Sequence, residues 1–261
     1  MHQPLSHIHP NAKIAHNVVI EPFVTIHNNV EIGKDTWIGP NVSILEGARI
    51  GNGCKIFPGS VISAVPQDLK FNGEKSLTII GDNVTIREYC TINRGTVDKY
   101  QTVIKDNALI MAYVHLAHDC LVGRNTILAN AVNLAGHVEI GDNVVVGGLS
   151  AIHQFVTIGN YVMISGGSLV RKDIPPYTKA AREPLSYAGI NSIGLRRRGF
   201  SDKKINEIQD IYRILFVRGY NISQALTYIE AEFAVTKERD EILNFIRKSD
   251  RGVMKGYVNK K

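Results

Sequence analysis

A strict six-residue period runs through most of this chain. Stepping by six from Ile8 to Val170, 25 of the 28 positions are Ile, Leu or Val. The residue two places before each of these 25 aliphatics is Ala, Val, Ser, Thr or Cys. A helix repeats every 3.6 residues or so and a half-buried strand every second residue, and neither produces this pattern. A coil of short strands does, with the aliphatic and the small residue facing inward and glycine or polar residues at the corners.

Three hexads close one triangular coil, so the period predicts a mainly β prism of about nine coils, roughly 45 Å long at the usual strand spacing. The pattern is lost in two places, residues 63–79 and 93–103, and resumes in phase after each. We therefore expect two loops that leave the coil there. Loops carried by a regular scaffold are where functional residues concentrate.

The period ends after Val170, and the segment Ile174-Pro175-Pro176-Tyr177 predicts the end of the β domain. We expect a β-helical domain over residues 1–175 and a small α-helical domain over 176–261. Ser201 is a suitable N-cap for a helix ending near Gly219. Two more helices are predicted over residues 222–233 and 238–248.

Composition narrows the protein class. No apolar run reaches the roughly 18 to 20 residues of a membrane span, and the N-terminus lacks the pattern of a signal peptide. The three cysteines, Cys54, Cys90 and Cys120, all fall on the small inward position of the hexad, which predicts buried thiols in a cytoplasmic protein.

Charge is uneven along the chain. Residues 1–170 carry 11 Lys and Arg against 13 Asp and Glu, a balance of −2, whereas residues 171–261 carry 19 against 11, a balance of +8. The basic C-terminal region, residues 171–261, either faces an anionic partner or simply forms a solvated surface.

Four of the nine histidines lie close together in the sequence, at His115, His118, His137 and His153. With 18 residues per coil and no phase break between them, His118, Gly136 and Gln154 should stack in one column, with His137 beside it. A titratable base next to a glycine amide on one face of a coil is typical of acyl transfer.

Two other interpretations of these histidines stay open. His115, His118 and His137 offer three nitrogens to a zinc ion, although the spacing differs from that of β-helical carbonic anhydrases. Alternatively, the histidines hydrogen-bond the backbone at the corners and have no chemical role.

Several motifs resemble the UDP-N-acetylglucosamine O-acyltransferases, which catalyse the first step of lipid A synthesis in Gram-negative bacteria. The resemblance covers nearly the whole chain. It is carried by Gln67-Asp68-Leu69-Lys70, Ile92-Asn93-Arg94-Gly95-Thr96, His115-Leu116-Ala117-His118-Asp119-Cys120, Leu134-Ala135-Gly136-His137, His153-Gln154-Phe155 and Leu195-Arg196-Arg197-Arg198-Gly199-Phe200.

The resemblance implies a left-handed parallel β-helix that assembles as a homotrimer, with active sites in the clefts between subunits. His118 matches the general base that deprotonates the glucosamine 3-hydroxyl, and Asp119 matches the carboxylate that orients it. The Gly136 N–H matches the oxyanion donor. The reaction would use no cofactor, no metal and no covalent intermediate.

The resemblance also suggests substrate contacts. Asp68 and Lys70, with Gln67 beside them, resemble residues that hold the sugar, and His115 and His137 resemble further sugar or phosphate contacts. The nucleotide and diphosphate end is implied for Gln154, Asn191, Arg197 and Arg198, and His153 belongs to the same substrate-binding set. Asn93 stands where some relatives have histidine, so we assign it no role.

The implied acyl donor is a hydroxyacyl chain on acyl carrier protein, an acidic partner that fits the basic C-terminal region better than nucleic acid does. Gly166 resembles the position that limits chain length, where glycine leaves room for about 14 carbons or more by family likeness; alternatively, it is an ordinary corner glycine. The acceptor group, a 3-hydroxyl or a 3-amino group, is left open.

Two further classes remain open from the sequence. A coenzyme A-dependent acetyltransferase would share the hexapeptide pattern. A non-catalytic scaffold or ice-binding β-helix would also share it, but would need threonine or charged ladders on a flat face and would leave the His118 column unexplained.

Overall fold

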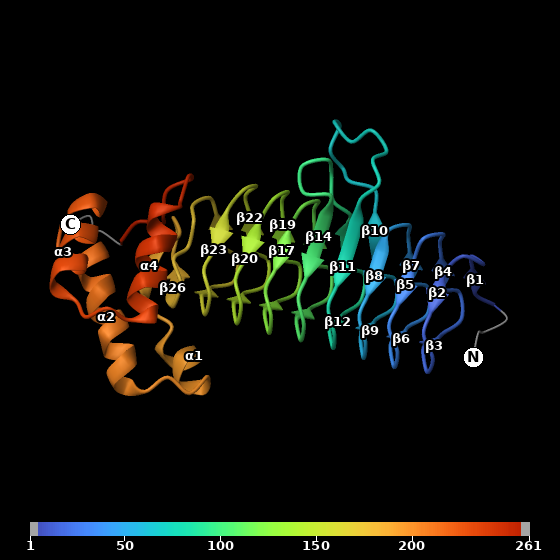
Figure 1. Ribbon diagram of the computed structural model, residues 1–261, viewed down its shortest axis with the longest axis horizontal. Coiled ribbons are helices and arrows are strands. Elements are labelled where there is room, and N and C mark those ends of the chain that lie inside the picture. The colour runs from blue at the N-terminus through green and yellow to red at the C-terminus, as the bar shows by residue number, and fades with distance from the viewer. Residues whose placement is uncertain (1–4, 257–261) are drawn as a thin grey trace.

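The computed structural model describes residues 5–256, and it is a triangular prism of stacked coils with a cluster of helices at one end (Figure 1). Each face of the prism is one sheet, and its strands pair in parallel except for the last strand of the third sheet, which is antiparallel. Successive strands of the chain belong to successive faces, so neighbours within a sheet are one coil apart. In an undisturbed coil this offset is 18 residues, as in the pairing of Leu116 with Leu134.

The first sheet contains nine strands: β1 (His7–Ile8), β4 (Thr25–Ile26), β7 (Ser43–Ile44), β10 (Val61–Ala64), β13 (Thr91–Asn93), β16 (His115–Leu116), β19 (Asn133–Leu134), β22 (Ala151–Ile152) and β25 (Leu169–Val170). The second contains eight: β2 (Lys13–Ile14), β5 (Glu31–Ile32), β8 (Ala48–Ile50), β11 (Leu77–Ile80), β14 (Gln101–Ile104), β17 (Leu121–Val122), β20 (Glu139–Ile140) and β23 (Thr157–Ile158). The third contains ten: β3 (Val19–Ile20), β6 (Trp37–Ile38), β9 (Lys55–Ile56), β12 (Thr85–Ile86), β15 (Leu109–Ile110), β18 (Ile127–Leu128), β21 (Val145–Val146), β24 (Met163–Ile164), β26 (Thr178–Ala181) and β27 (Ser186–Ile190).

The core inside the prism consists of the hexad aliphatics and the small residues two places before them. Cys54, Cys90 and Cys120 are free thiols buried in this core, as the hexad positions predict. Stacking identical inward positions buries a continuous apolar column, which is why a repeating sequence is stable only as a stack of coils.

Two loops leave the prism at the same edge, between the first and second sheets (Figure 1). They span residues 65–76 and 94–100, because β10, β11, β13 and β14 extend into the predicted breaks at 63–79 and 93–103. Both loops therefore replace one corner of a coil, and the pairing of β10 with β13 shifts register between Ile62 and Ala64, where the loops begin.

The third sheet continues past residue 175, where the sequence predicts the β domain to end. The third sheet continues through β26, which pairs in parallel with β24, and β27, which pairs antiparallel with β26. Ile158 pairs with Ile174 and Ile164 with Ala180, only 16 positions apart, so the last coil is two residues short and the period of six disappears from the sequence. Pro175 and Pro176 lie at a corner, where no sheet hydrogen bond is needed from their missing N–H groups.

Helices α1 (Ser192–Arg197), α2 (Asp202–Phe216), α3 (Ile222–Glu232) and α4 (Lys237–Arg247) form the C-terminal unit. The predicted cap is confirmed: Ser201 accepts a hydrogen bond from Lys204 N. The short helix α1 was not predicted. Tyr212 packs in the helical core and donates to Pro176 O at 2.6 Å, which fixes the helices to the last coil. No helix within residues 5–256 has the length and apolar character to cross a membrane.

Candidate active site

Two adjacent columns of side chains meet at the corner between the first and second sheets. The structure stacks His118, Gly136 and Gln154 on successive coils as the period predicts: His137 N donates to His118 O, and Phe155 N donates to Gly136 O, each at 3.1 Å. The neighbouring column contains Asp119, His137 and Phe155. All three residues of this second column have positive φ, between 60° and 63°, which is how the chain turns this corner.

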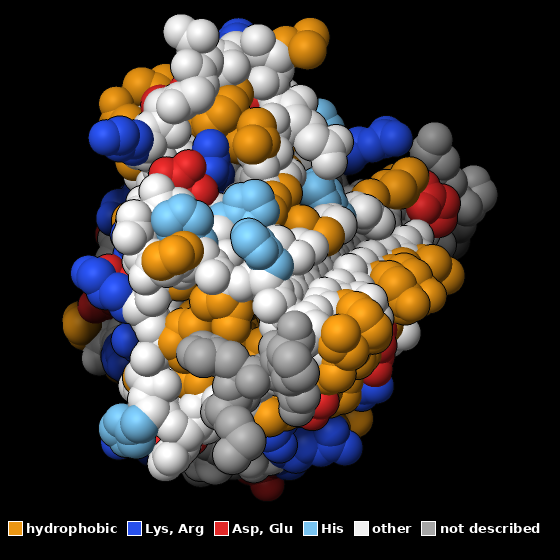
Figure 2. Space-filling view, turned by 90° about the vertical axis from the view of Figure 1, so that its right-hand side faces the viewer, with side chains coloured by type: hydrophobic (Ala, Val, Ile, Leu, Met, Phe, Trp, Pro, Cys, Tyr) orange, Lys and Arg blue, Asp and Glu red, His pale blue; other side chains and the backbone are white. Residues whose placement is uncertain are grey.

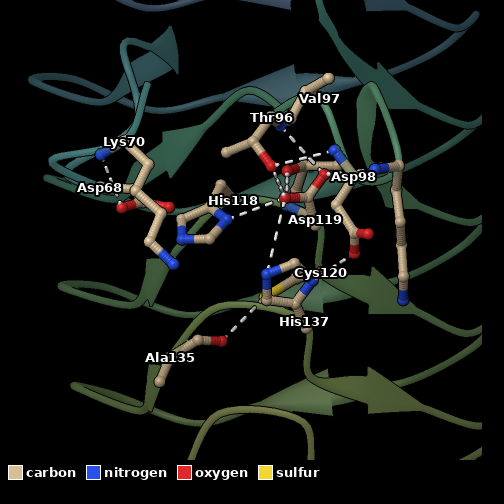
Figure 3. Close-up of polar contacts among 12 residues, drawn as sticks. Asp68, Lys70, Thr96, Val97, Asp98, His118, Asp119, Cys120, Ala135 and His137 are labelled. Atoms are coloured by element: carbon tan, nitrogen blue, oxygen red, sulfur yellow. Dashed lines mark hydrogen bonds and ion pairs between the residues drawn. The ribbon is translucent and has the colours of Figure 1, made fainter. Parts of the chain in front are cut away.

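His118 and Asp119 form a buried dyad (Figure 3). His118 Nδ1 lies 2.8 Å from Asp119 Oδ2, and the Asp119 side chain is fully shielded from solvent. Burial alone would raise the pKa of Asp119, but hydrogen bonds from Thr96 and His118 outweigh it and lower the pKa below its usual range. An ionised carboxylate only accepts, so the proton of His118 lies on Nδ1 and its Nε2 is free to accept one.

Gly136 leaves the space that the imidazole needs. A β-carbon on Gly136 would lie 2.8 Å from His118 Nε2, closer than ordinary carbon contacts allow. Among the described residues, the Gly136 N–H donates to no protein acceptor. A free amide beside a histidine with a free Nε2 is the pairing that acyl transfer requires.

His137 closes the site on the next coil. Its ring stacks on Phe155 with centroids 4.4 Å apart and meets His118 edge-on at 5.0 Å. Its Nδ1 lies 3.1 Å from Asp98 Oδ2 without the alignment of a hydrogen bond. Burial lowers the pKa of His137, which the charge of Asp119 opposes only in part, so this ring favours the neutral form.

The predicted residues of the first loop lie at the same corner as the two columns of side chains. A cavity of about 230 Å³ is lined by residues of both loops and of the second column, among them Asp68, Lys70, Thr96, His137 and Phe155. Figure 3 shows Asp68 and Lys70 on the side of His118 turned away from Asp119. Gln67 is exposed on the same loop.

The other histidines of the group lie further out. His115 precedes the corner, on the face of the first sheet, and its Nδ1 is 2.7 Å from Thr91 Oγ1. Burial lowers the pKa of His115, opposed by the interaction with Thr91. His153 and Gln154 are exposed one coil beyond Gly136, and His153 Nδ1 is 3.2 Å from Gln154 O.

The structure brings together a different set of candidate metal ligands from the three histidines that the sequence suggests. The described groups close enough to share one ion are His118, Asp119 and His137, whose ligand atoms lie within 4.8 Å of one another, and His115 is not among them. Asp119 Oδ2 is already hydrogen-bonded by Thr96 and His118.

Four predicted residues lie away from this corner within one chain. Gly166 lies at the corner between the third and first sheets, following β24, and is exposed. Helix α1 lies across the molecule from the two loops (Figure 1); Arg197 and Arg198, near its end, are exposed. Asn191 caps α1 and donates to Tyr161 O at 2.9 Å, so its side chain has a structural partner.

Sequence reasoning missed several residues of the site. Thr96 and Glu74, in the two loops, and Asp98 were not assigned roles, and Phe155 appeared only within a motif. The available signal was the second break in the period, where Asp98 occupies a hexad position that should be aliphatic. Loop residues have no periodic neighbours, so their partners cannot be computed from spacing.

An edge of the prism distinct from the site is lined with exposed apolar side chains. It is the corner between the third and first sheets, and it includes Phe23, Tyr89, Tyr113 and Leu149, each more than half exposed. Tyr89 and Tyr113 stack with centroids 5.5 Å apart. Figure 2, a view along the prism, shows large hydrophobic side chains along one edge. A contiguous exposed apolar strip of this kind marks an interaction surface.

Comparisons with known proteins agree with this geometry. Residues 173–254 match a family model described as UDP N-acetylglucosamine O-acyltransferase, domain 2, and residues 101–136 and 137–172 match a bacterial transferase hexapeptide model of six repeats. The acyl-(acyl-carrier-protein)–UDP-N-acetylglucosamine O-acyltransferase of Trichlorobacter lovleyi is 53% identical over 253 residues, covering 95% of this chain and 97% of the relative. That of Thermodesulfovibrio yellowstonii is 45% identical over 248 residues, covering 94% and 96%.

Solved structures of UDP-N-acetylglucosamine acyltransferases also match this chain. The UDP-N-acetylglucosamine acyltransferase of Bacteroides fragilis superposes with a TM-score of 0.96 at 52% identity, covering 98% of this chain and all of that one. The enzyme of Acinetobacter baumannii gives a TM-score of 0.94 at 40% identity, covering 97% and 99%. The fold is the left-handed parallel β-helix with a small C-terminal helical domain, and the chain belongs to the family of UDP-N-acetylglucosamine O-acyltransferases, which are enzymes.

Proposed function

We propose that this enzyme transfers a 3-hydroxyacyl chain from acyl carrier protein to the glucosamine 3-hydroxyl of UDP-N-acetylglucosamine, as the first step of lipid A biosynthesis. The activity named for relatives that align over nearly the whole chain supports these substrates. The single observation that carries the chemistry is the His118–Asp119 dyad, with a free imidazole nitrogen facing the Gly136 position.

His118 is the general base in this proposal. Its Nε2 removes the proton of the sugar hydroxyl as the oxygen attacks the thioester carbonyl, and the imidazolium then returns the proton to the leaving thiolate. Asp119 fixes the Nδ1–H tautomer and stabilises the positive charge that develops on the ring. General base catalysis of this kind contributes about 10²- to 10⁴-fold.

Gly136 would stabilise the tetrahedral intermediate through its backbone N–H. A donor aimed at the developing oxyanion is worth roughly 3 to 4 kcal/mol. We propose direct transfer without an acyl-enzyme. The nearest thiol in sequence, Cys120, faces the core, and burial raises its pKa to about 12, so it is a poor nucleophile. The mechanism assigns no role to a metal or another cofactor.

The sugar would bind between the loop residues Asp68 and Lys70 and the histidine column. Gln67, His115 and His153 surround this position in the proposal. The diphosphate and nucleotide would contact Gln154, Asn191, Arg197 and Arg198, because guanidinium groups bind phosphate in a bidentate manner.

A homotrimer fits the positions of these groups. His118 lies at one corner of the prism, whereas Gly166 and the apolar edge lie at another, and α1 lies across the molecule from the loops. Packing the apolar edge of one copy against a neighbour's site would place both sets of residues around one cleft. The basic C-terminal region would bind the acidic acyl carrier protein. The cytoplasmic location stays a prediction from sequence.

The test is an acyl-transfer assay with purified protein, UDP-N-acetylglucosamine and hydroxyacyl-acyl carrier protein. We expect His118→Ala to lower turnover by about 10²-fold or more, and His27→Ala, which changes an exposed histidine away from the site, to leave it unchanged. Retention of more than about a tenth of turnover by His118→Ala would contradict the base assignment.

The same assay separates the alternatives. Hydroxyacyl-coenzyme A as the better donor would favour a coenzyme A-dependent enzyme, and loss of turnover on treatment with EDTA would favour the metal interpretation. A 3-amino sugar nucleotide as the preferred acceptor would reassign the nucleophile but keep the dyad. Absence of turnover by the wild type with either donor would favour a non-catalytic scaffold.

A further inference from the structure

The Asp119 carboxylate is held by more than its histidine partner. Oδ1 accepts hydrogen bonds from Thr96 N at 3.0 Å and Lys99 N at 3.3 Å. Oδ2 accepts one from the Thr96 hydroxyl at 2.6 Å, beside the 2.8 Å contact to His118 Nδ1. One residue of the second loop therefore contacts both carboxylate oxygens.

The Thr96 hydroxyl is itself oriented. It accepts a hydrogen bond from Asp98 N at 3.4 Å, which directs its own proton toward Asp119 Oδ2. Thr96 is only 6% exposed, and Asp119 is 1% exposed, so water does not replace this bond easily. Hydrogen bonds to a buried charge are stronger and more costly to lose than those at a surface.

Two histidines lie within 4 Å of the Asp119 carboxylate. Its Oδ2 lies 2.8 Å from His118 Nδ1 and 3.9 Å from His137 Nε2. A rotation of the carboxylate would change which of the two imidazole rings it hydrogen-bonds. The bonds from Thr96 to both oxygens fix the plane of the carboxylate in the orientation that favours His118.

We propose that Thr96 is a positioning residue for the acyl-transfer reaction, which holds the Asp119 carboxylate so that it orients His118 rather than His137. This inference rests on the proposed roles of His118 and Asp119. It gives the second loop a mechanistic purpose, because a regular hexad corner would not supply a hydroxyl and two N–H groups to this carboxylate.

Loss of the Thr96 hydroxyl should let the carboxylate turn from His118 toward His137. The positive charge that develops on His118 then loses its partner, so the acidic limb of the kcat profile should move to lower pH. The other charged or titratable groups near this pair are Asp68, Lys70, Glu74, Asp98, Lys99 and His137, and the Thr96 substitutions leave all of them in place.

The experiment compares Thr96→Val, which keeps the shape and removes the hydroxyl, with Thr96→Ser, which keeps the hydroxyl. We expect Thr96→Val to lower kcat about 10- to 100-fold, the effect of losing one hydrogen bond to a charge, with KM for UDP-N-acetylglucosamine nearly unchanged. The acidic limb of the kcat profile should move to lower pH. Thr96→Ser should restore both kcat and the pH profile.

Thr78→Val is the matched control. Thr78 is buried nearby in β11, and among the described residues its hydroxyl has no hydrogen-bond partner, so the same substitution there should leave kcat and the pH profile unchanged. Because both Thr→Val variants carry the same change in a buried site, a difference between them reports the bond to Asp119.

Three results would overturn the proposal: unchanged kcat in Thr96→Val, equal losses in Thr96→Val and Thr96→Ser, or a loss of kcat with no shift of the acidic limb. Asp119→Asn supplies a further test, since adding Thr96→Val in that background should cost little more. Failure of the proposed function itself would be seen separately, as an active His118→Ala.

Discussion

The His118 imidazole lies in the space that a side chain at position 136 would fill. A β-carbon on Gly136 would come within 2.7 Å of His118 Cε1 and 2.8 Å of Nε2. The base His118 and the proposed oxyanion donor Gly136 are therefore neighbours on successive coils. Because Gly136 has no side chain, the His118 ring can occupy its present position.

Gly136→Ala tests this relationship. The added methyl must displace the imidazole, which Asp119 holds at Nδ1, so we expect kcat to fall at least about tenfold while the protein stays folded. Steady-state kinetics and circular dichroism measure the two effects. Gly148→Ala, at the same hexad position on a different corner, is the control. Wild-type kcat in Gly136→Ala would show that the imidazole is not needed in its present position.

Asp119 should make stability depend on acid pH. Its pKa is lowered in the folded protein from the ordinary value of 3.8, so its contribution is present above that value and is lost as pH falls through the folded pKa. In urea unfolding followed from pH 6 to pH 2.5, the stability advantage of wild type over Asp119→Asn should shrink on acidification. A constant difference across this range would contradict the pKa direction.

Arg197→Ala and Arg198→Ala should each weaken binding of the nucleotide sugar by about 1.5 to 3 kcal/mol, the cost of one lost charged hydrogen bond. Isothermal titration calorimetry with UDP-N-acetylglucosamine measures this directly. Arg196→Ala is the matched control, since Arg196 is paired with Asp202 at 2.8 Å. If only the apparent affinity for the acyl donor changes, these arginines contact acyl carrier protein instead.

Gly166→Met should shift donor preference toward shorter acyl chains. Each excluded methylene costs about 0.8 kcal/mol, so losing room for two lowers use of the long donor more than tenfold, and His118 is untouched. A competition assay with donors of different length measures the profile, and turnover of the best short donor is the internal control. An unchanged profile would mean that Gly166 is an ordinary corner glycine.

The three thiols should resist labelling until the protein unfolds. Burial raises the pKa of Cys54 and Cys90 to about 11 and that of Cys120 to about 12. At pH 8 the thiolate fraction is therefore small and shielded, and maleimide should react quickly only in denaturant. Rapid labelling of native protein at any of the three would show that its coil opens.

The six-residue period was sufficient to predict the prism of stacked coils. Because a coil of three hexads repeats every 18 residues, spacing alone placed His118 beside Gly136 and put Cys120 in the core. The same argument failed where the repeat is altered: the last coil is two residues short, so β26 and β27, which follow the predicted boundary at 175, were missed.

The contacts that the two loops make could be learned only from the tertiary structure. Thr96 reaches Asp119 across 23 positions, and Glu74 of the first loop accepts a hydrogen bond from Val97 N of the second at 3.1 Å. No period relates these residues, because a loop path depends on packing rather than on a repeated backbone geometry.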